Sequence, residues 1–114
     1  MVEALLEISE EDTGRWCTLS AAGEIDVATA PKLRERLDAT VDRGPALVVV
    51  DLSAVTFIDS TGLGVLIGTS KRIEDAGGAM RLVVSEPRIL KLFEITGLTD
   101  RFAIAPSVDE AVGS

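Results

Sequence analysis

Alternating apolar and polar residues at the start of the chain predict a pair of β-strands. In residues 2–8 every second side chain is apolar, the period of two that is typical of a half-buried strand. Residues 9–14 are polar and end in glycine, which predicts a turn. Residues 15–21 alternate again, with Cys17 on the more apolar face. The two strands are therefore expected to pair as an antiparallel hairpin.

Helical and strand patterns then alternate to the end of the chain. Residues 30–41 carry apolar side chains three and four positions apart, which predicts an amphipathic helix that either Asp26 or Thr29 can cap. Residues 46–50 are continuously aliphatic, as in a strand buried on both faces. The remaining predictions are helices over residues 63–73 and 87–93, strands over 80–84 and 102–104, and a short terminal helix that begins with the capping box Ser107 to Glu110.

The element order is ββαβαβαβα, which predicts an α/β fold around a mixed sheet of four to five strands with right-handed parallel crossovers. A length of 114 residues fits one domain, residues 1–114.

Charge and composition restrict the possible partners. The formal net charge is −8, so a nucleic acid would be repelled by most of the surface. No segment has the ~18–20 continuous apolar residues of a membrane span, and the first residues are acidic where a signal peptide is basic. A cytoplasmic protein without direct membrane contact is expected. With one cysteine and no histidine, neither an intramolecular disulfide nor a metal site is expected, and no cofactor is predicted.

The segment from Asp59 to Gly62 places three residues suited to capping a helix in a row, followed by glycine. One interpretation is that one of them caps the helix and the others have no further role. If Asp59 is the cap, however, Ser60 becomes the first helical residue and its hydroxyl faces solvent. A phosphate there would lie at the positive end of the helix, and the fold should tolerate it. Capping and function both remain open from spacing alone.

Glycines are frequent in this predicted helix, and each costs ~1 kcal/mol relative to alanine. For Gly64 and Gly68, close packing of the helix on the sheet is the favoured reason, with approach by a partner as the alternative. Gly62 lies nearest the exposed helix end, which favours approach by a partner.

Catalysis by Ser60 is not expected. Without histidine a Ser-His-Asp triad cannot form, and the candidate bases Lys71 and Lys91 are distant in sequence. The segment also lacks the Gly-x-x-x-x-Gly-Lys pattern of a phosphate-binding loop. A binding protein is predicted rather than an enzyme.

The sequence resembles the STAS-domain anti-sigma factor antagonists of bacteria from about Leu6 to Val112. The features that carry the resemblance are Gly23-Glu24-Ile25-Asp26, Asp51-Leu52, Phe57-Ile58-Asp59-Ser60-Thr61-Gly62-Leu63-Gly64, Gly77-Gly78, Pro87, Leu92-Phe93 and Gly97-Leu98. The resemblance implies a STAS-like domain with its helices mainly on one face of the sheet.

The resemblance also implies a partner-switching mechanism in transcription regulation, as in stress response or sporulation. The unphosphorylated protein binds an anti-sigma factor that is also a serine kinase, and the sigma factor is released. The kinase phosphorylates the serine that matches Ser60, which ends the complex, and a PP2C-type phosphatase removes the phosphate. The partner-binding residues that it implies are Asp26, Asp59, Ser60, Thr61 and Gly62. A monomer or weak dimer is expected, and an accessory protein of a lipid-transport or stress-signalling complex is the alternative.

Overall fold

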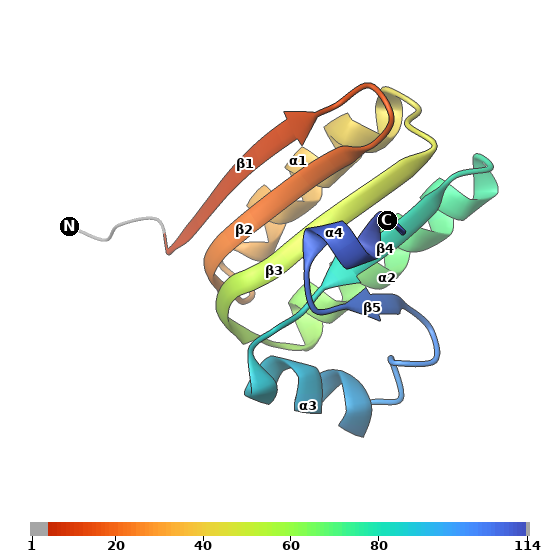
Figure 1. The fold of residues 1–114 in the computed structure, drawn as a ribbon. Helices are drawn as coiled ribbons and strands as arrows, with labels where there is room; N and C mark the ends of the chain where they lie inside the picture. Colours follow the sequence, from red (N-terminus) through yellow and green to blue (C-terminus); the bar gives the residue numbers. More distant parts are fainter. Residues whose placement is uncertain (1–4, 114) are drawn as a thin grey trace.

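Five strands form one sheet with the spatial order β1-β2-β3-β4-β5 in the computed structural model, which describes residues 5–113 (Figure 1). The strands are β1 (Leu6–Asp12), β2 (Cys17–Ile25), β3 (Leu47–Ile58), β4 (Ala79–Val83) and β5 (Ala103–Ala105), and the helices are α1 (Ala30–Asp42), α2 (Ser60–Asp75), α3 (Pro87–Ile95) and α4 (Val108–Ala111). Strand β1 pairs antiparallel with β2, and the other neighbouring pairs are parallel. The predicted order and the mixed α/β sheet are confirmed, while residues 2–4 of the first predicted strand lie outside the described residues.

The two faces of the sheet are covered unequally. Helices α1 and α2 lie side by side on one face, and α3 lies at the edge where β4 ends (Figure 1). All three contribute to the main core, for example through Leu37, Leu66 and Phe93. Helix α4 lies on the opposite face, where it packs against Val49 and Val83. The face in front of β1 and β2 carries no helix (Figure 1). No helix within residues 5–113 is both long enough and apolar enough to cross a membrane.

Strand β1 is longer than predicted, because it continues through Asp12 into the polar segment predicted as a turn. Glu10 forms an ion pair with Arg43 and accepts a hydrogen bond from the buried Thr40 hydroxyl (3.2 Å). These partners on and after α1 satisfy an inward-facing carboxylate, so a polar sequence is stable as a strand. The turn prediction was therefore wrong for residues 9–12.

Strands β2 and β3 also extend beyond their predicted ranges, up to Ile25 and Ile58. Two register shifts interrupt their pairing, and such irregularities break the simple alternation from which strands are predicted. Gly23 allows the close approach of the chain before β1, since a Cβ there would lie 2.0 Å from the Leu5 carbonyl oxygen and its φ is +118°. The longer strands carry both segments that follow them to one edge of the sheet.

Candidate functional site

The carboxyl ends of β2 and β3 bring two acidic turns together. Ile25 and Ile58, the last residues of these parallel strands, are paired, and the Asp59 N–H donates to the Ile25 carbonyl (3.1 Å). Asp26 and Asp59 follow directly. The N-termini of α1 and α2 therefore start at the same edge of the sheet.

Asp59 caps α2 and leaves Ser60 at the surface. The Asp59 Oδ1 atom accepts the N–H groups of Thr61 (2.9 Å) and Gly62 (3.2 Å). Ser60 is the first residue of α2 and its side chain is exposed. Within the described residues its hydroxyl makes no hydrogen bond. Capping by Asp59 thus produces the arrangement predicted for that case, a free hydroxyl at the positive end of a helix.

Asp26 holds the turn between β2 and α1. Its Oδ1 atom accepts the N–H groups of Ala28 (2.9 Å) and Thr29 (3.0 Å) and lies 3.3 Å from the Thr29 hydroxyl. That hydroxyl donates to the Glu24 carbonyl (2.7 Å) and accepts the Asp26 N–H (2.9 Å). Thr29 is the capping residue of α1 by position, but its side chain makes no capping bond. Asp26 instead receives the N–H groups that precede the helix.

The glycines of α2 have roles opposite to those expected. Gly62 is buried, and a Cβ there would lie 2.5 Å from Ile25 Cγ2 and 2.8 Å from Ile58 Cγ1, so this glycine lets the helix pack on the sheet. Gly64 and Gly68 are exposed, and a Cβ on either would meet nothing within 4 Å. The expectation that Gly62 makes room for a partner was wrong, and so was the expectation that Gly64 and Gly68 pack on the sheet.

A groove of about 260 Å³ starts beside the site and runs between α1 and α2. Its lining comes from both helices and comprises Arg34, Asp38, Thr61, Gly64, Val65, Gly68, Thr69 and Arg72. Gly64 and Gly68 keep this groove open, since neither contributes a side chain. Thr61 is exposed and links the groove to Ser60. Arg72 and Asp38 form an ion pair across the groove.

Sequence patterns missed two exposed apolar residues near this edge. Val27, in the turn held by Asp26, is 72% exposed, and Phe57, at the end of β3, is 47% exposed. Phe57 directly precedes the apolar Ile58, and simple alternation along a strand would place the two side chains on opposite faces. The two register shifts between β2 and β3 interrupt this alternation, so the face of Phe57 could not be read from the sequence. Exposed apolar side chains beside a polar site are typical of protein contact surfaces.

Comparison with known proteins identifies the family of the chain. The STAS domain model matches residues 7–111. An anti-sigma-B factor antagonist of Bacillus subtilis is 42% identical over 82% of this chain and 85% of its own length, and one of Listeria monocytogenes is 40% identical over 83% and 82%. The crystal structure of an anti-sigma factor antagonist from Mycobacterium paratuberculosis is 34% identical, covers 94% of this chain and 91% of its own, and superposes with a TM-score of 0.87. On this agreement in sequence and fold, the chain belongs to the STAS domain family.

Proposed function

We propose that this chain is an anti-sigma factor antagonist whose binding is switched off by phosphorylation of Ser60. In its unphosphorylated form it binds an anti-sigma factor that is also a serine kinase, and the sigma factor is released. The observation that carries the proposal is the exposed Ser60 hydroxyl at the start of α2, held there by the Asp59 cap. The names of the relatives, which are anti-sigma factor antagonists, support the same function.

The position of Ser60 suits a switch on physical grounds. A phosphate adds ≈ −1.5 to −2 charge. The positive end of α2 compensates part of this charge, so the domain tolerates the modification. The same charge would be added at the edge that carries Asp26 and Asp59 and is already acidic. A partner packed against this edge would have to remove water from the charged phosphate. Because that removal costs free energy, phosphorylation weakens binding.

The residues of the site divide into contacts and supports in this proposal. Ser60 and Thr61 are exposed and contact the partner directly. Asp59 contributes through the cap and Asp26 through the turn that presents Val27. Gly62 is buried and acts only by letting α2 approach the sheet.

The resemblance to anti-sigma factor antagonists implies the other components of the switch. The partner kinase binds the ATP whose phosphate is transferred to Ser60, so the chain itself needs no cofactor. A PP2C-type phosphatase reverses the modification, and the exchange takes place in the cytoplasm, where sigma factors act. We infer a binding protein rather than an enzyme: Lys71 lies in α2 about 16 Å along the helix from Ser60 at ~1.5 Å per residue, too far to act as its base.

The direct test is a phosphorylation assay. The chain is incubated with each anti-sigma factor kinase encoded in its genome and with ATP, and the phosphate is located by mass spectrometry. Transfer to Ser60, and none to the Ser60→Ala variant, is the expected result. The exposed neighbour Thr61 is an internal control for specificity. Transfer to Thr61 alone, or to no residue with any kinase, would contradict the proposal.

A further inference from the structure

Two exposed apolar side chains lie near the edge of the sheet that carries Ser60, one directly before β1 and one near the end of β3. Leu5 is 49% exposed and Phe57 is 47% exposed. Glu24 lies between them, because it is paired with Phe57 across β2 and β3 and its N–H donates to the Leu5 carbonyl (2.8 Å). The three residues form a row across the ends of three neighbouring chain segments.

This row lies on the face of the sheet opposite α1 and α2. The next residues along the chain, Leu6, Ile25 and Ile58, belong to the main core. Because successive side chains of a strand point to opposite faces, the row faces away from that core. Helix α4 covers a different part of this face, over β3 and β4 (Figure 1). The side chains of Leu5 and Phe57 remain exposed.

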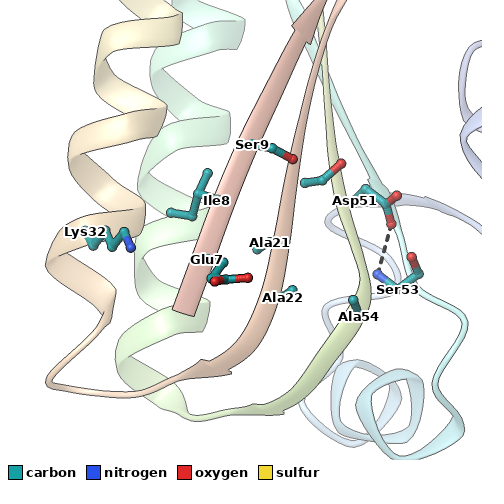
Figure 2. A pocket seen from close by; sticks show the side chains of 10 residues that line it. Glu7, Ile8, Ser9, Ala21, Ala22, Lys32, Asp51, Ser53 and Ala54 are labelled. Atoms are coloured by element: carbon teal, nitrogen blue, oxygen red, sulfur yellow. Dashed lines mark hydrogen bonds between the residues drawn. The ribbon is translucent and has the colours of Figure 1, made fainter. Parts of the chain in front are cut away.

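The same face of the sheet has a hollow of about 490 Å³, and Figure 2 shows the side chains that line it. Its lining includes Glu7, Ala22 and Ala54, which are paired across β1, β2 and β3 and form a second row parallel to the first. The alanines leave space above the sheet. Among the described residues of the lining, the acids Glu7 and Asp51 outnumber the one cation, Lys32, which donates to the Leu6 carbonyl (2.7 Å). The surface therefore combines an apolar rim with a shallow acidic depression.

The charge of this surface selects its occupant. A second copy of the chain related by a two-fold axis would bring Glu7 and Glu24 close to the same two acids of the other copy, and like charges repel. Nucleic acids and anionic membranes are disfavoured by the same charge. A protein that presents Lys or Arg flanked by apolar side chains is complementary. Phe57 also lies only three residues before Ser60, so a protein that contacts Ser60 is close to this surface.

We propose that Leu5 and Phe57, with Glu24 between them, form a docking point that the anti-sigma factor contacts in addition to Ser60. This inference rests on the proposed function and adds a second contact on the sheet face opposite α1 and α2, beside the part that α4 covers. Buried apolar anchors contribute much of the affinity of an interface, and complementary charges increase the rate of association. Docking is thereby separate from the transfer of phosphate.

The test uses the kinase that phosphorylates the wild-type chain. Its affinity is measured by isothermal titration calorimetry for the variants Leu5→Thr and Phe57→Thr, with Ile95→Thr as the matched control because Ile95 is an exposed apolar residue (72%) at the end of α3. We expect each docking variant to bind about tenfold more weakly and the control to bind within about twofold. In the kinase reaction the same variants should raise KM and leave kcat unchanged.

Two charge-reversal variants give a second measurement, which leaves the apolar side chains unchanged. Glu24→Lys should slow association with the kinase, whereas Glu94→Lys, at an exposed position of α3, should leave its rate nearly unchanged. Thermal melting verifies that each variant is folded. Wild-type affinity in both folded docking variants would overturn the docking point and leave the Ser60 switch intact. A wild-type chain that binds no anti-sigma factor would overturn the proposed function and this inference together.

Discussion

Because Gly62 has no side chain, the start of α2 can pack closely against the sheet. The space that a Cβ atom would need is occupied by the side chains of Ile25 and Ile58, which are both buried core residues. Gly64, two residues later, faces open space. The two positions therefore have opposite requirements, although both are glycines in one helix.

Substitution of these two glycines should change stability in opposite directions. Gly62→Ala gains ~1 kcal/mol of helix propensity but forces overpacking that costs about 1–3 kcal/mol. Because both contacts would be shorter than 3.0 Å, we expect an overpacking cost in the upper part of this range, about 2–3 kcal/mol, and therefore a net loss of about 1–2 kcal/mol in the free energy of unfolding. Gly64→Ala should gain up to about 1 kcal/mol. Urea unfolding measures both, and changes of the same sign would contradict the packing described here.

Cys17 is a second residue whose surroundings decide its chemistry. Burial raises the pKa of the Cys17 thiol above 9.0, and the nearby Asp12 carboxylate raises it further. The folded protein therefore keeps the thiol proton at pH values where the unfolded chain has lost it. Stability associated with this group is present below pH 9 and decreases as the pH rises above 9, because the unfolded state then binds fewer protons.

Alkylation with iodoacetamide tests this pKa directly. The rate for the folded protein should rise with pH at a higher midpoint than the rate for the chain in urea, because only the thiolate reacts. Coinciding midpoints, or a lower one for the folded protein, would show that Cys17 is not shielded.

At the scale of single elements, the cap of α2 and the turn before α1 together form the site. The Asp59 carboxylate satisfies two N–H groups of α2, and the Asp26 carboxylate satisfies two N–H groups ahead of α1. Both acids follow paired strand ends, so each turn fixes the position of the other through the sheet. The acidic residues at this edge are therefore structural as well as electrostatic.

Removal of the Asp59 cap should loosen the helix end that carries Ser60. Asp59→Ala should lose about 1 kcal/mol of stability, and hydrogen exchange of the Thr61 and Gly62 amides should accelerate. Asp59→Asn retains a side-chain oxygen acceptor and is the matched control. If alanine and asparagine gave equal exchange rates at these two amides, the capping role would be refuted.

At the scale of the whole molecule, phosphorylation of Ser60 should alter the surface and not the fold. Ser60 is exposed and outside the core, so we expect phosphorylation to change the free energy of unfolding by less than about 1 kcal/mol. In a domain of this size, 1 kcal/mol corresponds to a shift of about 4–8 °C in the melting temperature, and the observed shift should be smaller. Amide chemical shifts should change only in the Asp26 turn and in the first turn of α2. Changes across β4 and β5 would instead indicate a rearranged fold.

Much of this architecture could be predicted from the sequence, because periodicity depends on near neighbours in the chain. The element order and the position of Ser60 after its cap are of this kind. The end of β1 could not be predicted, since Glu10 is stabilised by Arg43 from a distant segment. The glycine roles depend on Ile25 and Ile58, which only the folded sheet brings against α2. The exposure of Phe57 depends on bulges in β3 that interrupt its alternation.

The central claim is that the charge state of Ser60 controls partner binding, and the affinity of the anti-sigma factor for the two forms of the chain tests it most directly. Calorimetry with unphosphorylated and Ser60-phosphorylated protein should show binding at least about tenfold weaker after phosphorylation, a change of about 1.4 kcal/mol. Ser60→Ala should bind like the unphosphorylated form, and Ser60→Glu more weakly. Equal affinity of the phosphorylated and unphosphorylated chains would contradict the switch.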